Sequence, residues 1–356
     1  MAYQLLPEWV SQEALILAYP HSNTDWDTWL EDARAVYHAI IEHITTASGV
    51  VLLLTDKNDI AALVERYSHQ AGVIIIPAEF NDTWVRDYGF LTLEHNGTLQ
   101  AIEFEFNGWG NKFNAQLDTQ VNRRYLSPLL ANPLISYSEI VEGGALEIDS
   151  NGHLLSTAKC LYHKARNPDF DQNDYQAFFN RTLGARHTTI LEHGHLENDD
   201  TDGHIDTLAR FTLDNGIVYQ GAENRRTDTH FTGLSDMAAE LQVAFPKATL
   251  HPLPLPIINY KEDDGVSTRL PASYANYLIF NDMILAPIYA APEDEAAIEV
   301  LKHAYPHHQI IPVNCATLVK QYGSLHCITM QVPQGTLKPA CIEKALMGSY
   351  VLDPGQ

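Results

Sequence analysis

The chain has 356 residues, of which 45% are hydrophobic, and 45 Asp and Glu stand against 22 Lys and Arg to give a formal net charge of −23. This composition excludes an intrinsically disordered chain, and a protein of this size can bury about three quarters of its unfolded surface. The charge, with no cluster of Lys and Arg, argues against a nucleic-acid partner and favours a cationic one. The N-terminal residues lack the pattern of a signal peptide and no aliphatic run could span a bilayer, so we predict a cytoplasmic protein with no membrane partner.

Short apolar runs alternate with helical patterns along the whole sequence. Residues 15–20 predict a strand, residues 27–44 an amphipathic helix, and residues 50–55 and 73–78 buried strands. The sequence therefore indicates an α/β fold. Since no linker, low-complexity tract or shift of composition divides it, we predict a single domain over residues 1–356.

Polar turns that contain glycine recur before strand-like sequence at roughly equal intervals. Their glycines are Gly89, Gly143, Gly203, Gly265 and Gly323, which are 54, 60, 62 and 58 residues apart. This spacing suggests five similar units of strands and helix, and a closed radial arrangement of such units would leave few exposed sheet edges. An ordinary mixed sheet is the alternative. In a radial arrangement, the turns would converge at one end of the axis and form the site.

The four cysteines, Cys160, Cys315, Cys327 and Cys341, contain no C-x-x-C pair, so we predict neither a disulfide framework nor a zinc site from them. Cys327 lies in an apolar, β-branched segment after a glycine turn, where most cysteines are buried and inert. It could act as a nucleophile if a proton-transfer partner such as His204 lies nearby. We interpret the other three cysteines as structural.

The segment HGHLENDDTDGHIDTLARF (193–211) contains several groups that could carry chemistry. Alternation along a strand would place His204 and Asp206 on the same face. His193 and His195 could join them as ligands of a metal ion, although the spacing matches no common zinc motif. The simpler interpretation is that His193 and His195 are ordinary loop or strand residues.

Two further carboxylates precede glycine turns: Asp87, next to Arg86, and Glu142, next to Gly143. Several carboxylates around one pocket can hold a planar cation such as guanidinium through paired hydrogen bonds. Asp87 could instead pair with Arg86 or cap a turn. Trp84 and Trp109 could offer aromatic faces to a cation or pack in the core.

Four ordered motifs together resemble the agmatine deiminase family, which belongs to a guanidino-modifying superfamily with the bacterial type of peptidylarginine deiminase. The motifs are D-T-W-V-R-D-Y-G (82–89), E-G-G (142–144), T-D-G-H-I-D (201–206) and G-S-L-H-C-I-T-x-Q-x-P (323–333). The resemblance extends over essentially the whole chain. It implies a five-bladed α/β propeller of the pentein type, with pseudo-fivefold repeats.

The resemblance also implies a mechanism and a set of residues. Cys327 would be the nucleophile and His204 the general acid and base, while Asp87 and Asp206 would bind the guanidinium. Glu142 would support the histidine. The reaction would hydrolyse agmatine to N-carbamoylputrescine and ammonia in polyamine biosynthesis, with no metal and no organic cofactor. Trp84, Trp109 and Asp82 are the candidates for substrate binding, and Trp109 and Asp82 are those for the far end of the substrate.

The sequence departs from the expected motifs at three places. Ala145-Leu146-Glu147 stands where a serine and a histidine are expected, Thr207 stands where Asn is common, and Gln321-Tyr322 replace a more glycine-rich segment. These departures concern the part of the site that would receive the substrate's tail. Acidic residues expected at the rim, at positions 199, 200 and 262–264, suit a terminal amine better than a carboxylate.

Several functions remain open. Within the class, the rivals are a deiminase of arginine or peptidylarginine and an amidinotransferase. From other classes, the rivals are a metal-dependent hydrolase that uses His193, His195, His204 and Asp206, and a noncatalytic polyamine-binding protein. The expected partner is a small cationic guanidino substrate. A homodimer is one option for the oligomeric state.

Overall fold

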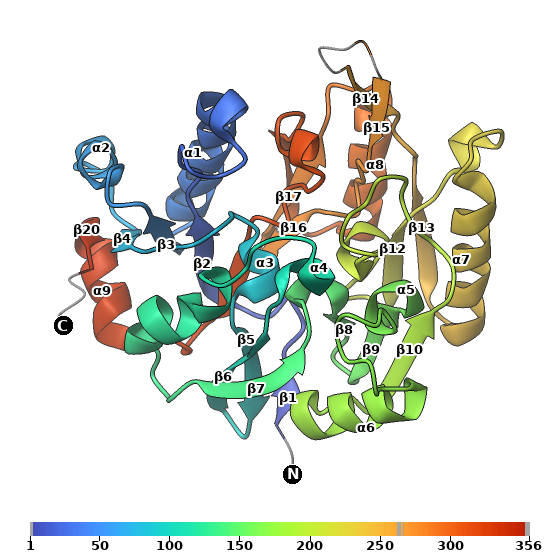
Figure 1. The fold of residues 1–356 in the computed structure, drawn as a ribbon, viewed down its shortest axis with the longest axis horizontal. Helices are drawn as coiled ribbons and strands as arrows, with labels where there is room; N and C mark the ends of the chain where they lie inside the picture. Colours follow the sequence, from blue (N-terminus) through green and yellow to red (C-terminus); the bar gives the residue numbers. More distant parts are fainter. Residues whose placement is uncertain (1–2, 262–264, 266, 353–356) are drawn as a thin grey trace. The chain divides into compact units, whose positions relative to one another are not determined.

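The computed structural model describes residues 3–261, 265 and 267–352 (Figure 1). The chain divides into two compact units: a first unit of residues 1–143 and 327–356, and a second unit of residues 144–326. The prediction of one domain stays a prediction. None of the helices in the described ranges is long and apolar enough to cross a membrane.

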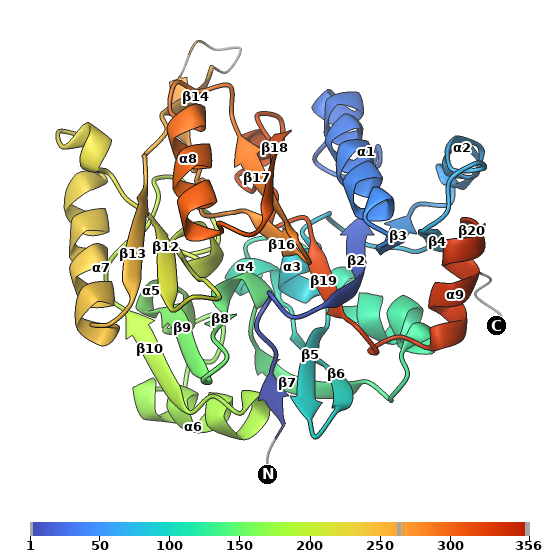
Figure 2. The ribbon, with the colours of Figure 1, turned by 180° about the vertical axis from the view of Figure 1, so that it is seen from behind.

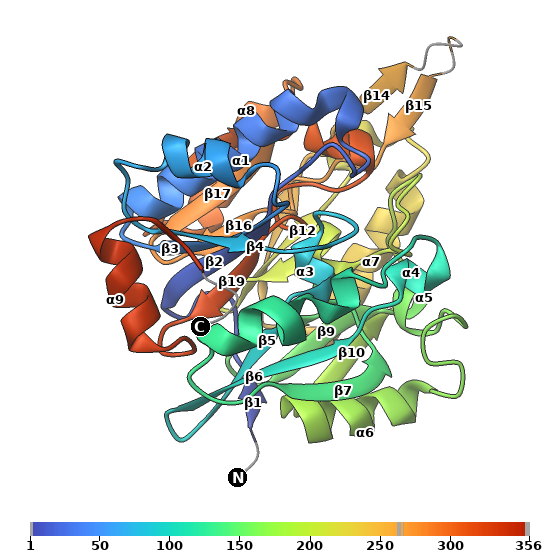
Figure 3. The same cartoon turned by 60° about the vertical axis from the view of Figure 1, so that its left-hand side comes forward.

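A five-stranded sheet with the order β19-β2-β3-β4-β20 forms part of the first unit. Its strands β2, β3 and β4 are parallel, and β19 is antiparallel to β2. The apolar run of β3 is buried at all six residues, as expected for a parallel strand covered on both faces. Figure 3 shows β3, β2 and β19 side by side below α1 and α2. The elements are β2 (Gln12–Ala18), η1 (Asp27–Trp29), α1 (Leu30–Thr46), β3 (Val50–Thr55), α2 (Ile60–Arg66), β4 (Val73–Pro77), β19 (Met330–Pro333), α9 (Pro339–Met347) and β20 (Tyr350–Val351).

The other sheet of the first unit has the order β1-β5-β6-β7. Strands β5 and β6 form a hairpin around Asn96 and Gly97, whose φ angles of 51° and 79° are those of the tight turn that Asn-Gly favours. Short helices precede and follow this hairpin. The elements are β1 (Gln4–Leu5), α3 (Val85–Tyr88), β5 (Leu91–His95), β6 (Thr98–Glu105), α4 (Gly108–Asn111), η2 (Asp118–Gln120), η3 (Asn122–Leu126), η4 (Ser127–Leu129) and β7 (Ile135–Ile140).

The second unit contains three three-stranded sheets and the hairpin β14-β15. Its sheets are β8 (Glu147–Ile148), β9 (His153–Thr157) and β10 (His187–Leu191); β11 (Ala209–Phe211), β12 (Gly216–Gln220) and β13 (Thr249–Leu253); and β16 (Leu278–Phe280), β17 (Met283–Ile288) and β18 (Gln309–Asn314). The hairpin is β14 (Ile258–Lys261) and β15 (Ser267–Leu270). The helices are η5 (Gly143–Ala145), which begins at the unit boundary, α5 (Ala158–Leu161), α6 (Gln172–Leu183), η6 (Ile205–Thr207), η7 (Glu223–Arg225), α7 (Phe231–Ala244), α8 (Asp294–Ala304) and η8 (Leu318–Gln321). Figure 2 shows α7 running alongside β13.

One pattern of strand pairing recurs five times within the described residues. In each case an antiparallel pair is followed, after a helical segment, by a strand parallel to the second of the pair. The first unit holds two such modules, β19-β2-β3 and β5-β6-β7, and the second unit holds three. The α/β class and the five similar units predicted from the sequence are therefore confirmed.

Four of the five predicted glycines, Gly89, Gly143, Gly203 and Gly323, precede the first strand of a module. The prediction for Gly265 is wrong, because this residue lies between β14 and β15, in a hairpin additional to the repeat. The corresponding module begins later, at β16, after a turn without glycine. Spacing alone could not separate an inserted hairpin from the module that follows it.

Candidate active site

In the first unit, Cys327 lies next to the short helix α3. The backbone N–H of Arg86 donates to the carbonyl oxygen of Cys327 over 3.2 Å. The guanidinium of Arg86 is buried, donates to Glu8 Oε1 over 3.0 Å, and also donates to Gln331 Oε1. Arg86 therefore links the helix that carries Asp87 to the Cys327 segment through its backbone, and it contacts Glu8 and Gln331 through its guanidinium.

The Asp87 carboxylate has a dedicated donor. Trp109 Nε1 donates to Asp87 Oδ2 over 2.9 Å, and both side chains are buried. Trp109 has a left-handed φ of 56° and stands between Gly108 and Gly110, whose φ angles are 69° and 81°. A Cβ on Gly108 would lie 2.2 Å from the carbonyl oxygen of Phe113. The glycines thus permit a tight turn that aims the indole N–H at Asp87.

Gly143 explains why the E-G-G segment can approach α3. A Cβ at this position would lie 2.1 Å from the carbonyl oxygen of Arg86 and 3.2 Å from Cε of Met330. Glu142, which precedes it, is 1% exposed. In the first unit, the backbone of Arg86 therefore contacts both the Cys327 segment and the segment that follows Glu142. Asp87 is the next residue in the chain after Arg86.

Asp82 and Trp84 lie in a loop that is held by the carboxylates of Asp82 and Asp118. Asp82 Oδ1 accepts from the backbone N–H of Thr83 over 2.7 Å, and Asp118 Oδ1 accepts from the backbone N–H of Asp82 over 3.2 Å. Burial raises the pKa of Asp82 to about 6 and that of Asp118 to about 8. Trp84 packs on Trp26, with ring centroids 5.7 Å apart. A substrate-binding role for Asp82 and Trp84 stays a prediction.

In the second unit, hydrogen bonds fix the loop that precedes His204. Asp199 Oδ2 accepts from the backbone N–H of Gly203 over 2.6 Å, and Arg166 pairs with Asp202 at 2.8 Å. Asp199, which we expected at the rim, therefore accepts a hydrogen bond within this loop. Residues 262–264 of the expected rim lie outside the described residues. His204, at the end of the loop, is 1% exposed.

Asp206 forms a buried pair with His326. Their Nδ1 and Oδ2 atoms are 2.7 Å apart, and each residue is 1% exposed. Burial by itself would raise the pKa of Asp206, but the hydrogen bond from His326 and the positive charges of His326, His204 and Arg210 outweigh it, so the pKa is lowered. Sequence reasoning missed His326, although its position directly before Cys327 inside a recognised motif was a signal.

The departure at Glu147 also has a structural reason. Arg210 Nε donates to Glu147 Oε2 over 2.6 Å, and the two side chains are 0% and 2% exposed. Glu147 Oε1 also accepts from the backbone N–H of Phe211, and Arg210 donates to the carbonyl oxygen of Tyr277 over 3.0 Å. Glu147 is thus the partner of a buried arginine and joins β8 to β11.

The chain is similar to known proteins over most of its length. A family model described as Porphyromonas-type peptidyl-arginine deiminase matches residues 4–333. The chain belongs to this family. An agmatine deiminase from Stutzerimonas stutzeri (strain A1501) is 26% identical over an alignment of 354 positions that covers 93% of this chain and 95% of the relative.

Solved structures agree with this membership. An agmatine deiminase from C. jejuni, solved with substrate bound and a cysteine replaced by serine, is 32% identical with a TM-score of 0.86, over 94% of this chain and 97% of that chain. A structure named as a peptidyl-arginine deiminase is 37% identical with a TM-score of 0.87, over 94% and 99%. The fold is therefore that of the agmatine deiminases, and the protein is a deiminase that hydrolyses a guanidino group, as the motifs predicted.

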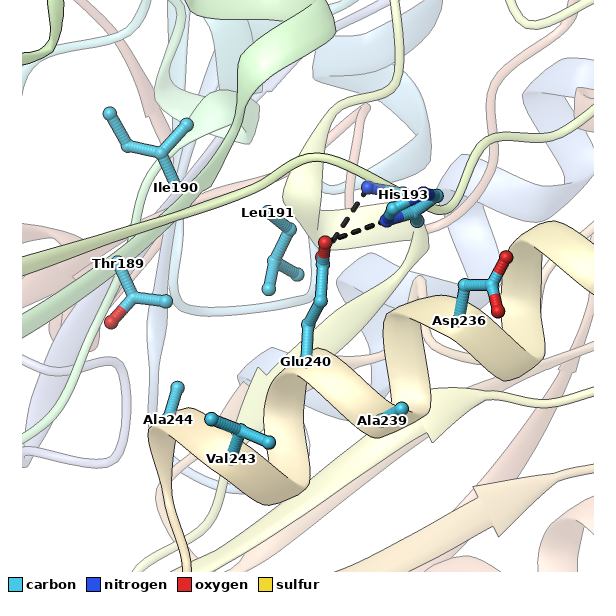
Figure 4. A pocket seen from close by; sticks show the side chains of 9 residues that line it. All are labelled: Thr189, Ile190, Leu191, His193, Asp236, Ala239, Glu240, Val243 and Ala244. Atoms are coloured by element: carbon cyan, nitrogen blue, oxygen red, sulfur yellow. Dashed lines mark hydrogen bonds and ion pairs between the residues drawn. The ribbon is translucent and has the colours of Figure 1, made fainter.

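Among the described residues, His193 and His195 are not grouped with other possible metal ligands. His193 Nδ1 lies 2.7 Å from Glu240 Oε1, at an open surface groove of about 600 Å³ between β10 and α7 (Figure 4). Among residues 3–261, 265 and 267–352, no group of three or more His, Cys, Asp and Glu close enough to share an ion includes His193, His195 or Asp206. The ligand set expected for a metal-dependent hydrolase is therefore not brought together.

The cysteines differ in their surroundings. All four lie within the described residues, and none forms a disulfide. Cys160 and Cys315 are fully buried, and burial raises the pKa of Cys315 to about 12, which suits an inert thiol. Cys327 is 6% exposed, and its backbone carbonyl oxygen accepts a hydrogen bond from Arg86 in α3. This contrast favours Cys327 as the reactive thiol.

Proposed function

We propose that this deiminase acts on agmatine and converts it with water into N-carbamoylputrescine and ammonia. The observation that carries the proposal is the pair of buried motif carboxylates, Asp87 and Asp206, each with its own hydrogen-bond donor, Trp109 or His326. A planar guanidinium is the cation that such oriented carboxylates bind best. The agmatine deiminases of S. stutzeri and C. jejuni support agmatine as the substrate.

We propose that Cys327 is the nucleophile, and that Asp87 and Asp206 bind the guanidinium while it reacts. The Cys327 thiolate adds to the central guanidinium carbon and forms a C–S bond. His204 donates a proton to one amino group, the C–N bond breaks, and ammonia leaves. The product of this half-reaction is an amidino-thioether on Cys327.

Water then completes the reaction. His204 takes a proton from the water as its oxygen adds to the same carbon, and the C–S bond breaks to return the thiolate and release the ureido product. Glu142 supports His204 in both steps. The C. jejuni structure, which has substrate bound to a protein with serine in place of a cysteine, agrees with a reaction that depends on a thiol.

The rival substrate is arginine, free or within a peptide, because the family model and one close structure carry a peptidyl-arginine name. A terminal amine suits the strongly acidic chain better than the carboxylate of free arginine does. We further propose a cytoplasmic enzyme of polyamine biosynthesis, since its product is a carbamoylated putrescine. Trp84, Trp109 and Asp82 are proposed to bind the substrate.

Release of ammonia from three substrates tests this proposal. The substrates are agmatine, free arginine and an acylated arginine amide, each with the unmodified protein and with Cys327→Ala, and with a chelator as control. The expected result is the highest kcat/KM for agmatine, no effect of the chelator, and no activity in Cys327→Ala. A higher kcat/KM for the arginine amide would transfer the assignment to a peptidylarginine deiminase. Activity that survives Cys327→Ala would reject thiol chemistry.

A further inference from the structure

We propose that His326 is a positioning residue of the deimination, which keeps Asp206 oriented and ionised for the guanidinium. This proposal rests on the proposed function and adds a residue to it. The evidence is the buried contact of 2.7 Å between His326 Nδ1 and Asp206 Oδ2. Because an ionised carboxylate only accepts hydrogen bonds, Nδ1 must carry the proton of this bond.

The backbone of His326 is itself held in place. Its N–H donates to the side-chain oxygen of Asn276 over 2.9 Å, and Asn276 is 1% exposed. Two residues earlier, Ser324 Oγ lies 2.8 Å from the hydroxyl of Tyr289, which donates to the carbonyl oxygen of Ser273. These hydrogen bonds restrict the backbone that carries His326, and so they restrict the position from which its imidazole contacts Asp206.

Among the described residues, His326, His204 and Arg210 are charged groups that lower the pKa of Asp206. Arg210 is already bonded to Glu147 at 2.6 Å, so its charge is shared with a second carboxylate. His204 is the proposed proton carrier and changes its charge during the reaction. His326, in contrast, contacts Asp206 directly. The proposed chemistry does not change the protonation state of His326.

Loss of this hydrogen bond has a defined consequence. A carboxylate as buried as Asp206 is costly to ionise, and each donor removed favours its protonated form. A neutral Asp206 would bind a guanidinium less well but would leave the Cys327 thiol chemically intact. Removal of His326 should therefore affect cationic ligands much more than neutral ones.

A matched pair of alkylating agents tests this difference. 2-Chloroacetamidine is a small cation that resembles the guanidinium, and 2-chloroacetamide is its neutral counterpart; both alkylate a thiolate with loss of chloride. Alkylation of Cys327 is followed by peptide mass spectrometry in the unmodified protein, His326→Ala, His326→Asn and the exposed control His307→Asn. Asn retains an N–H donor close to the position of Nδ1.

We expect His326→Ala to lower the rate with the amidine about tenfold near neutral pH, as it would if burial without this donor raised the pKa of Asp206 to about one unit above the assay pH, and to change the rate with the amide less than about twofold. His326→Asn should restore most of the rate, and His307→Asn should match the unmodified protein. In His326→Ala, the acidic limb of kcat/KM for agmatine should also move to higher pH.

Two outcomes separate the failure of this inference from that of the proposed function. If the unmodified protein prefers the amidine and His326→Ala has the same preference and the same acidic limb, His326 does not position Asp206. If the unmodified protein shows no preference for the amidine, the guanidinium site itself is wrong. Equal losses with both reagents in a folded His326→Ala would indicate a merely structural role and would also overturn the inference.

Discussion

Trp109 and Asp87 are joined by a buried hydrogen bond of 2.9 Å between the indole N–H and the carboxylate. The tryptophan reaches this position from a left-handed backbone conformation with a φ of 56°, which costs about 1–2 kcal/mol for a residue other than glycine. Such a conformation persists only where the surrounding structure enforces it. We infer that the turn is retained for the orientation of the indole N–H toward Asp87.

Replacement of Trp109 by Phe should therefore reduce kcat/KM while the protein remains folded. Phe keeps an aromatic ring but removes the donor, and a hydrogen bond to a charged group is worth about 1.5–3 kcal/mol, or about 10- to 150-fold. Steady-state kinetics with agmatine measure this effect. Trp29→Phe, at a partly exposed position, is the control and should leave kcat/KM unchanged. Equal kinetics for Trp109→Phe and the unmodified protein would remove the role we assign to the indole N–H.

Replacement of Gly143 by Ala should destabilise the protein, because the new Cβ would lie 2.1 Å from the carbonyl oxygen of Arg86. Such overpacking lowers the free energy of unfolding by about 1–3 kcal/mol or more. The free energy of unfolding in urea measures it. Gly233→Ala is a matched control in α7, where the Cβ would meet nothing within 4 Å, and it should be neutral or stabilising by up to about 1 kcal/mol. Equal stabilities of the two variants would contradict the close packing at Gly143.

Asp118 should make stability fall as the pH rises. Burial raises its pKa from 3.8 to about 8 in the folded protein, so the folded state binds this proton more tightly than the unfolded state. The resulting stabilisation is fully present below the unfolded pKa and is lost as the pH rises through about 8. Asp118→Asn keeps an oxygen for the N–H groups of Asn81 and Asp82 and cannot ionise.

We therefore expect the free energy of unfolding to decline from pH 5 to pH 9 more steeply in the unmodified protein than in Asp118→Asn, by a few kcal/mol. Urea unfolding at several pH values measures both slopes. Asp169→Asn, at an exposed position, should retain the slope of the unmodified protein. Parallel curves for Asp118→Asn and the unmodified protein would show that Asp118 ionises normally.

Binding of a cationic substrate analogue should promote ionisation of Cys327. Carboxylates near a thiol disfavour the thiolate, and a bound guanidinium neutralises them and favours it. Thiolate absorbance, titrated with and without an unreactive amidine, should give a lower apparent pKa for the complex. Cys327→Ser supplies the baseline from the other cysteines. An apparent pKa that does not change when the amidine binds would refute substrate-assisted ionisation.

The sequence predicted the local elements well where one pattern dominated. The run of aliphatic residues at 50–55 coincides with β3, since a parallel strand covered on both faces needs a continuous apolar run. The helix predicted over residues 27–44 corresponds to η1 and α1, which end at Thr46. The fourth repeat was placed wrongly at Gly265, because the inserted hairpin β14-β15 has the same turn chemistry as a module boundary.

The α/β class, the family and the motif residues, including Cys327, Asp87 and Asp206, could be predicted without the structure, because local periodicity and ordered motifs are properties of neighbouring residues. Only the tertiary structure showed that Asp206 pairs with His326, 120 residues away, and that Glu147 pairs with Arg210, 63 residues away. Such pairs depend on which strand ends converge after folding. The partners of each buried charge, and with them its ionisation, were therefore decided by the fold.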